Sequence, residues 1–400
     1  MRTFISFDEA NQIVLAEARG MGTHLCSVDD ALGRILAEDV ESQDNIPPFA
    51  SSAMDGYAVR SQDVQEGVLL EVIEHIPAGQ VPQRIVSAGS CARIMTGAPI
   101  PEGADAIIPR EVSHEKDGKV QFSTTTEKGK HIRPAAEDIR IGDVVFLKGQ
   151  RITPPVVGML ATLGKDMVRV SKKPNVVVLS TGDEVVSPSK KPGPGQIRNS
   201  NGPALRAQVL MAGGHCPAYI HLPDNPEAIR EAILANTGAD LMIFSGGVSV
   251  GDHDYVKEVL DELGMELMFW KVRQRPGKPL AFGRLGNTLV LGLPGNPVSS
   301  STCFMMYGKP IIQALLGARE PDAGERAVLL EDVQKVSNLH YFARGILRQD
   351  AEGRSVVSLT GPQGSNLFGS VVKANCILHL PEGVALVEKG TLMRVDRLSW

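Results

Sequence analysis

The sequence predicts a multidomain chain of mixed α/β and β structure, built around a central α/β domain with a parallel sheet. Three observations indicate this. A length of 400 residues is enough for about two to three domains. The 41 glycines and 26 prolines favour many turns over a helical bundle. Between residues 171 and 319, continuous apolar strands alternate with segments of helical periodicity, which is typical of a parallel sheet covered on both faces.

A small domain of mixed, helical character is expected at the N-terminus. It comprises residues 1–42 together with residues 140–170, which follow an inserted domain. Capping boxes that start at Ser6 and Ser27 predict two helices, and a third is expected from Pro154 onward.

Two domains rich in β structure are expected on either side of the α/β domain. Residues 43–139 form the inserted one, because short valine and isoleucine runs alternate there with glycine and proline. Asp117 and Gly118 predict a tight hairpin turn within it. Residues 320–400 return to this pattern and form a C-terminal β domain.

The α/β domain is expected over residues 171–319. Its apolar strands are expected at residues 175–180, 217–222, 240–245 and 266–272. A helix follows each of the first three strands, and the first of these helices ends at Gly213. A longer helix is expected over residues 297–316.

Composition excludes several classes of protein. An apolar content of 42% excludes disorder, and a net charge of −5 with scattered basic residues argues against nucleic-acid and membrane partners. The five cysteines form no CxxC motif, so neither a disulfide framework nor a zinc site is expected. The N-terminal residues lack the apolar run of a signal peptide, which predicts a cytoplasmic protein.

The ligand site is expected beyond the carboxyl ends of the parallel strands. The loops at these ends are residues 180–184, 221–226, 245–254, 273–279 and 292–300. One of them is a candidate phosphate cradle that contains Ser245, Gly246, Gly247, Ser249 and Gly251. A plain tight turn is the alternative, since the pattern matches neither a Walker A motif nor a dinucleotide fingerprint.

Three carboxylates follow three different strands in these loops. Glu184, Asp224 and Asp254 are hard oxygen donors, and beside a phosphate cradle they predict a Mg²⁺ site. Helix capping is the alternative for two of them. Either Asp224 or Asn225 would cap the helix that starts at Pro226, and Asp254 would cap the next one.

Cations crowd the loop after the fourth strand, around Pro276 and Gly277, which are expected to stiffen the turn and expose backbone amides. Lys271, Arg275 and Lys278 would hold a substrate oxyanion there, although a solvated edge strand would show a similar charge pattern. In the last loop Pro294 and Pro297 fix a turn before a helix. Free amides at that turn, together with Ser299, suit a second anionic group.

Collinear motifs along essentially the whole chain resemble one known family. They are SSAMDGYAV (51–59), MTGAPIPEGADAIIPRE (95–111), IRPAAEDIRIGD (132–143), LSTGDE (179–184), IRNSN (197–201), SGGVSVGDHDY (245–255), PGKP (276–279), LPGNPVSS (293–300) and QGSNLFGSVVKANCILHLPEG (363–383). The family is that of the molybdopterin molybdenumtransferases, whose eukaryotic relatives include the E domain of gephyrin. The resemblance implies Mg²⁺-dependent insertion of molybdate into adenylylated molybdopterin, with release of AMP and formation of molybdenum cofactor.

The resemblance also implies which residues act. The matching positions are Asp55, Thr96, Arg133, Asp138, Glu184, Asp224, Asp254, Lys271, Arg275, Pro294 and Pro297. Asp55, Thr96 and the three loop carboxylates are expected to be catalytic, with those three carboxylates binding Mg²⁺. Molybdate is expected at Lys271, Arg275 and Lys278, in a pocket that Arg344 and Ser365 complete.

The family further implies a homodimer in which the insert of one subunit completes the site of its partner. A molybdopterin adenylyltransferase and a molybdoenzyme or chaperone are expected as protein partners. Two positions depart from the family pattern. Arg275 stands where lysine is common, and Cys376 replaces a common glycine, where a positive φ would strain it.

Two other functions remain open on the residues alone. The α/β domain is shared with molybdopterin adenylyltransferases and nicotinamide-nucleotide amidases, so a Mg²⁺-dependent nucleotide pyrophosphatase or amidase is one alternative. A non-catalytic scaffold is the other. The sequence does not distinguish molybdate from tungstate, which have nearly the same size and charge.

Overall fold

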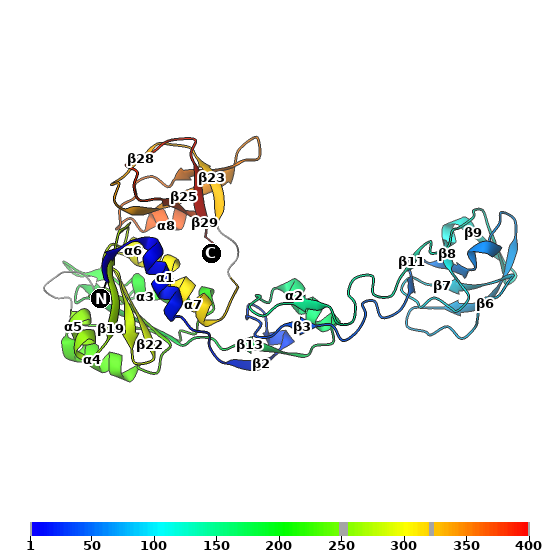
Figure 1. Ribbon diagram of the computed structural model, residues 1–400, viewed down its shortest axis with the longest axis horizontal. Coiled ribbons are helices and arrows are strands. Elements are labelled where there is room, and N and C mark those ends of the chain that lie inside the picture. Colours follow the sequence, from blue (N-terminus) through cyan, green and yellow to red (C-terminus); the bar gives the residue numbers. More distant parts are fainter. Residues whose placement is uncertain (1, 248–254, 320–323, 399–400) are drawn as a thin grey trace. The chain divides into compact units, whose positions relative to one another are not determined.

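The computed structural model describes residues 2–247, 255–319 and 324–398 (Figure 1). The chain divides into two compact units. The first contains residues 1–37, 149–157 and 167–400, and the second contains residues 38–148 and 158–166. The finer division into four domains stays a prediction.

A seven-stranded sheet forms the centre of the first unit. Its strands, in spatial order, are β1 (Arg2–Ile5), β19 (Glu266–Val272), β21 (Ala281–Leu285), β22 (Thr288–Leu293), β18 (Leu241–Ser245), β14 (Val176–Thr181) and β17 (Tyr219–Leu222). Only β21 among them runs antiparallel to its neighbours. Two residues join β21 to β22, and a connection this short is possible only between antiparallel strands. The other six strands are parallel, as the sequence predicts.

Helices cover both faces of this sheet (Figure 1). They are α1 (Phe7–Glu17), α3 (Asn201–Ala212), α4 (Pro226–Ala235), α5 (Tyr255–Glu262), α6 (Pro297–Cys303) and α7 (Lys309–Leu315). Buried residues of α1, α3, α6 and α7 share one core with the sheet, whereas α4 and α5 pack in a second core. Helix α3 ends, as expected, at Gly213, which has a φ of 98°.

The long helix predicted over 297–316 contains a π-helical turn. This turn, η4 (Phe304–Gly308), separates α6 from α7, and the Lys309 amide bonds to the Phe304 carbonyl five residues earlier. Pro310 follows at once and has no amide hydrogen to donate. The wider turn therefore falls where the regular α-helical ladder is already interrupted.

The first strand and helix pack with the α/β sheet, a placement that the residue pattern did not predict. β1 pairs in parallel with β19, and Ser6 caps α1 as expected, accepting a hydrogen bond from the Glu9 amide at 3.2 Å. The helix predicted from Ser27 is wrong. Only a 3₁₀ turn, η1 (Val28–Asp30), forms there, because Gly33 at a φ of 76° turns the chain away.

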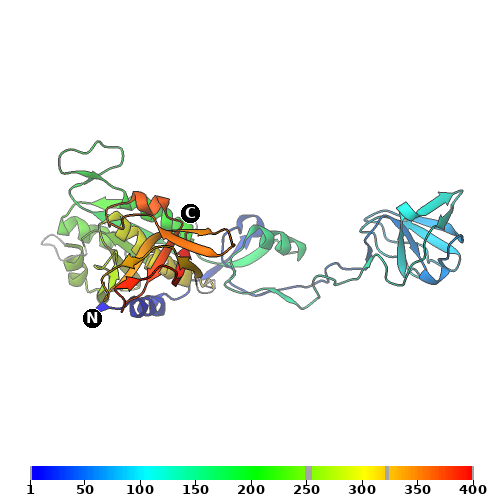
Figure 2. The same cartoon turned by 90° about the horizontal axis from the view of Figure 1, so that it is seen from above.

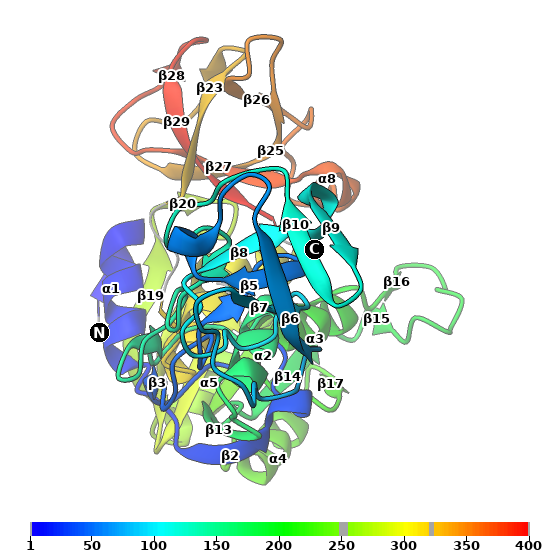
Figure 3. The ribbon, with the colours of Figure 1, turned by 90° about the vertical axis from the view of Figure 1, so that its right-hand side faces the viewer.

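The chain on either side of the inserted domain also forms a short antiparallel pair and one helix. β2 (Thr23–Ser27) pairs with β13 (Met167–Ser171), and α2 (Pro154–Thr162) begins at the proline that predicts it. β15 (Val185–Val186) pairs with β16 (Ile197–Arg198), and the loop between them extends away from the α/β sheet (Figures 2 and 3).

The C-terminal β domain is a six-stranded sheet in which five strands close into a barrel and the sixth pairs at its edge. Its strands, in order, are β20 (Gln274–Arg275), β25 (His340–Gln349), β26 (Ser355–Leu359), β23 (Glu325–Leu329), β29 (Leu392–Arg397) and β27 (Cys376–Leu380). Pairing of β25 with β27 closes the barrel, and β20 pairs with β25 at its edge. A small pair, β24 (Val333–Gln334) and β28 (Leu386–Val387), and a helix, α8 (Gly369–Lys373), complete it. Cys376 lies inside β27 and has no positive φ, so the strain considered for it is absent.

The second unit is built on a six-stranded sheet, as expected for the insert. Its strands, in order, are β8 (Ala106–Pro109), β5 (Gly56–Val59), β7 (Ser90–Ile94), β6 (Leu69–Ile76), β10 (Lys119–Phe122) and β9 (Ser113–Lys116). Asp117 and Gly118 join β9 to β10 with φ values of 51° and 74°, which confirms the predicted tight turn. Shorter elements are β3 (Val40–Glu41), β4 (Ser51–Ser52), β11 (Ile132–Arg133), β12 (Val144–Phe146), η2 (Ser61–Asp63) and η3 (Arg110–Val112).

Within the described ranges, none of the helices has both the length and the apolar character that crossing a membrane requires.

Candidate active site

Four parallel strands end side by side along one edge of the central sheet. Ser180 of β14 is in register with Ser245 of β18, which in turn is in register with Leu293 of β22. Thr181 of β14 is in register with Leu222 of β17. The loops that the sequence singles out therefore begin at a common edge, where bound ligands are usually found in this class of sheet.

Two of these loops are joined by their own aspartates. The Asp183 amide donates to Asp224 Oδ2 at 3.3 Å, and the Asp224 amide donates to Asp183 Oδ1 at 3.1 Å. Asn225, not Asp224, caps α4, because its side chain accepts a hydrogen bond from the Ala228 amide at 2.9 Å. The capping alternative for Asp224 is thereby removed. Glu184 is exposed and Asp224 is partly exposed, so both carboxylates can reach a ligand.

Glycines allow close approach of the backbone at the same edge. A side chain at Gly182, whose φ is 135°, would have its Cβ 2.7 Å from Glu184 Oε2. A side chain at Gly246 would meet Thr181 Oγ1 at 2.9 Å, and the Gly246 amide already donates to the Leu293 carbonyl. Packing thus explains part of the glycine loop. Its predicted members Ser249 and Gly251, and the carboxylate of Asp254, lie outside the described residues.

An asparagine and serine network lies beneath the loops and was missed in the sequence. Asn201 Nδ2 donates to Ser245 Oγ at 2.8 Å and to the Gly295 carbonyl at 2.7 Å. Asn199 Nδ2 donates to Ser180 Oγ at 2.8 Å. Both asparagines belong to the IRNSN motif, which was the available signal. Side-chain amides that bridge three strand ends fix the positions of these loops.

The proline turn of the last loop adjoins the C-terminal domain. Pro294 is buried, and Pro297 is the first residue of α6. The Val298 amide donates to the Ser365 carbonyl at 3.3 Å, so Ser365 lies at the start of this helix. Ser299 is only 3% exposed and is held within α6, which leaves it poorly placed to contact a ligand directly.

The basic loop is held from below by a buried polar cluster. Gln274 Nε2 donates to the Gly277 carbonyl at 3.0 Å, and the Tyr307 hydroxyl bonds to Gln274 Oε1. Gly277 is buried at a φ of 88°, and a Cβ there would lie 2.1 Å from Cys303 Sγ. The glycine is needed for packing, so the expectation that it exposes amides to a ligand is wrong.

The predicted cations of this loop rest on aromatic rings. Lys271 Nζ lies 3.8 Å from the Trp270 ring centroid, and Lys278 Nζ lies 5.1 Å from that of Phe4. Lys271 has a φ of 67°, which is rare for a residue with a long side chain and often marks a functional site.

Arg344 is a buried cation beside the same loop. Its side chain is 1% exposed, and it donates to Ser370 Oγ at 3.0 Å and to the Gly364 carbonyl at 3.1 Å. Within the described part of the chain no carboxylate pairs with it. Burial, and then the nearby charge of Arg275, lower the pKa of Arg344 to about 10. A charge held in this way favours an anionic ligand.

The predicted residues of the insert lie in the second unit. Asp55 Oδ1 accepts hydrogen bonds from the Thr96 amide and hydroxyl, both at 2.7 Å. These two hydrogen bonds lower the pKa of Asp55 and hold it as a carboxylate, and the bond from the amide has the larger effect. Both side chains are exposed. Arg133, on β11, and Asp138, in the loop after it, are also exposed, and among the described residues no hydrogen bond or ion pair joins their side chains to this pair.

The donor set suits Mg²⁺ but is described only in part. Glu184 and Asp224 follow neighbouring strands, and Mg²⁺ is usually held by one or two carboxylates together with water and substrate phosphates. Among the residues that the structure describes, no group of three acidic, histidine or cysteine side chains could enclose a metal ion. Asp254, the third predicted ligand, is not among them.

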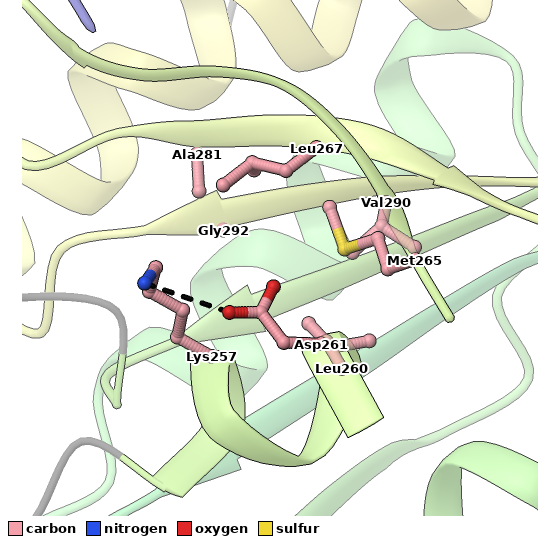
Figure 4. Close-up of a pocket in the computed structure, with 8 residues that line it drawn as sticks. All are labelled: Lys257, Leu260, Asp261, Met265, Leu267, Ala281, Val290 and Gly292. Atoms are coloured by element: carbon pink, nitrogen blue, oxygen red, sulfur yellow. Dashed lines mark ion pairs between the residues drawn. The ribbon is translucent and has the colours of Figure 1, made fainter. Parts of the chain in front are cut away.

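A small cavity elsewhere in the α/β domain is no alternative site. It lies between α5 and the sheet, has a volume of about 10 Å³, and carries the ion pair of Lys257 with Asp261 at 3.6 Å (Figure 4). This volume holds at most about one water molecule. Within the α/β domain the strand-end edge remains the candidate active site.

Three family models together cover most of the chain. Residues 5–164 match the MoeA N-terminal region (domain I and II), residues 177–314 match a probable molybdopterin binding domain, and residues 326–397 match the MoeA C-terminal region (domain IV). The fold and these matches thus define a protein of the molybdopterin-binding class.

Curated relatives and solved structures match this chain over nearly its full length. A molybdopterin molybdenumtransferase of Haemophilus influenzae is 39% identical over 94% of this chain and 93% of its own length, and one of Bacillus subtilis is 36% identical over 98% and 94%. Two crystal structures of the molybdopterin biosynthesis MoeA protein from Pyrococcus horikoshii cover 99% of this chain and all of their own. Their TM-scores are 0.86 and 0.84, at 27% and 30% identity. The chain belongs to the molybdopterin molybdenumtransferase family and is an enzyme of that family.

Proposed function

We propose that this chain inserts molybdenum from molybdate into adenylylated molybdopterin, with Mg²⁺ as cofactor and AMP as the released product. The observation that carries the proposal is the distribution of charge along one sheet edge. Acidic loops follow β14 and β17, whereas the basic loop follows β19. β14 and β19 are four strand steps apart, which is roughly 19 Å at the usual spacing between strands.

This distance supports an extended substrate. A small ion alone would need only one of the two regions. A pterin joined through a diphosphate to adenosine offers phosphate oxygens to the acidic end, where Mg²⁺ would neutralise them when bound. Its other end offers a metal-binding dithiolene near the basic loop. There Lys271 and Arg275, with the buried charge of Arg344, suit a tetrahedral oxyanion.

Each group of the chain then has a stated role. Glu184 and Asp224 hold the cation and orient the diphosphate, while the Asn201 network keeps their loops in register. During turnover a water molecule cleaves the phosphoanhydride bond to the adenylyl group, so AMP leaves and the pterin keeps its own phosphate. The basic loop holds molybdate at the opposite end until the two dithiolene thiols bind its metal and one oxide ligand leaves with their two protons as water.

We further propose that two copies of the chain share each site. In this arrangement Asp55 and Thr96 of one copy serve the strand-end edge of the other, and their paired geometry supplies a fixed carboxylate. A molybdopterin adenylyltransferase would supply the substrate, and a molybdoenzyme or its chaperone would receive the product. The protein would act in the cytoplasm.

The test is a measurement of AMP. The purified protein is incubated with adenylylated molybdopterin, and molybdate and Mg²⁺ are added separately and together. AMP is expected only when both are present, and tungstate in place of molybdate measures the preference between the two. AMP release that ignores both additions would contradict the proposal and favour a simple pyrophosphatase.

A further inference from the structure

Arg275 is held by a tyrosine of the C-terminal domain. The two residues are partners in the parallel register of β20 and β25. Arg275 Nη1 donates to the Tyr341 hydroxyl at 3.2 Å, and Arg275 Cζ lies 5.4 Å from the centroid of the Tyr341 ring. Across the described residues, no carboxylate forms an ion pair with Arg275. The phenol is therefore the side chain that fixes this guanidinium.

Tyr341 is itself fixed by contacts that do not involve Arg275. Its hydroxyl accepts a hydrogen bond from the Val336 amide at 3.3 Å. Lys335 Nζ lies 5.3 Å from the ring centroid and donates to the Leu339 carbonyl at 2.8 Å, which ties the turn before β25. The ring and hydroxyl are thus already in place for Arg275. Tyr341 therefore loses little further conformational freedom when it orients the guanidinium.

A neutral partner matters at this position. Arg344 lies three residues beyond Tyr341, and the charge of Arg275 reaches it, since that charge lowers its pKa. A carboxylate beside Arg275 would orient it equally well but would cancel the charge that an anion needs. A phenol orients the guanidinium by a hydrogen bond and by its ring face and leaves the positive charge intact.

We propose that Tyr341 is a positioning residue, which holds the Arg275 guanidinium so that its remaining N–H donors are arranged to bind a tetrahedral oxyanion. The proposal rests on the function proposed above and adds a residue to it. Arginine forms a rigid planar fork, so its orientation matters more than that of a lysine ammonium. Arg275 and Tyr341 thus form one unit within the site.

The test is the kinetic effect of Tyr341→Phe on the dependence of AMP release on molybdate. The variant keeps the ring face but loses the hydroxyl, which accepts hydrogen bonds from the Arg275 guanidinium and from the Val336 amide. Because the first of these is a bond to a cation, the KM for molybdate is expected to rise about three- to tenfold, with kcat nearly unchanged. Tyr341→Leu removes the ring as well and should raise it further. Calorimetric titration of molybdate into the protein without molybdopterin gives an independent measure of the same loss.

Two controls separate positioning from folding. Tyr219→Phe removes a hydroxyl at the amino end of β17, opposite the strand-end edge, and should change neither KM nor kcat. In an Arg275→Lys background, Tyr341→Phe should change the KM less than twofold, because a flexible ammonium depends less on orientation.

The outcomes distinguish this inference from the function on which it rests. Wild-type turnover that depends on molybdate, with an unchanged KM in Tyr341→Phe, overturns the role of Tyr341 alone. An equal loss in both arginine and lysine backgrounds also overturns it. Wild-type AMP release that is independent of molybdate overturns the proposed function and this inference together.

Discussion

Asp183 and Asp224 bond to one another reciprocally, each backbone amide to the other's carboxylate, across the ends of β14 and β17. This pairing fixes the loop that carries Glu184 against the loop that carries Asp224. The two neighbouring polar residues Asp224 and Asn225 therefore have different roles. Asn225 caps α4, whereas one carboxylate oxygen of Asp224, Oδ1, accepts no hydrogen bond from the described residues.

Replacing Asp224 with Ala should therefore abolish turnover with little loss of stability. The matched variant Asn225→Ala should do the reverse, because removing a helix cap costs about 1 kcal/mol of unfolding free energy and leaves the carboxylate in place. Urea unfolding and AMP release measure the two effects. Full activity in Asp224→Ala at low temperature would assign that residue to structure alone.

A second prediction concerns the space around Gly182. Gly182→Ala would place a Cβ 2.7 Å from Glu184 Oε2, at a φ of 135°. The carboxylate must move, and turnover should fall by about a hundredfold, as is common when a catalytic group is displaced by about 1 Å.

Gly195→Ala is the matched control for Gly182→Ala. Gly195 also has a positive φ, of 78°, but has nothing within 4 Å of the added Cβ. Both variants should lose stability by about 1 kcal/mol, since both force alanine to a positive φ. Similar activity in the two variants would show that the position of Glu184 is unimportant.

The central sheet could be predicted from the sequence because its signals are local and strong. Apolar strands followed by helices with clear ends, such as α3 with Gly213, determine a parallel sheet and the edge at which its loops lie. β21 and β1 could not be predicted in the same way. The direction of β21 depends on a two-residue turn, and β1 is placed by pairing with β19, more than 260 residues later.

The site residues differ in the same way, because some are placed by local sequence position and others by contacts between distant segments. Glu184 and Asp224 stand directly after strands, where position in sequence predicts position in space. Tyr341 pairs with Arg275 from another domain, and no local pattern contains that contact. Gly277 shows the opposite error, because a glycine beside cations suggests an exposed anion site, while the structure uses it to pack against Cys303.

A further prediction concerns pH and the partly buried residue His340. It packs against Phe342 and Phe7, and its Nε2 lies 3.3 Å from His379 Nδ1, which is linked in turn to Asp396. Burial first, then the charges of His379, Lys335 and Arg394, lower the pKa of His340 to about 3 from 6.5, and Asp396 opposes this shift.

The sign of the effect follows from proton binding. Between pH 6.5 and about 3 the unfolded chain binds a proton at His340 and the folded chain does not. Stability should therefore fall as the pH falls through this range, by at most about 1.4 kcal/mol per pH unit from this one group. His340→Gln should flatten the curve from urea unfolding. Parallel curves for wild type and His340→Gln would contradict the prediction.

The last prediction tests whether two copies of the chain share each site. Asp55 and Thr96 lie in the second unit, and the strand-end carboxylates lie in the first. Asp55→Asn has nearly the same shape and can still accept the two hydrogen bonds from Thr96, but it removes the negative charge. Glu184→Gln likewise removes the charge at the strand edge with little change in shape. Each variant should therefore be folded and inactive. In a shared site, a mixed dimer contains one site with both defects and one site with neither. Random exchange of subunits in equal amounts places half of the chains in mixed dimers, so about a quarter of the wild-type activity should return. Native mass spectrometry of one isotope-labelled variant establishes that exchange has taken place. If mixed dimers form and no AMP is released, Asp55 acts within its own chain or has no part in the reaction.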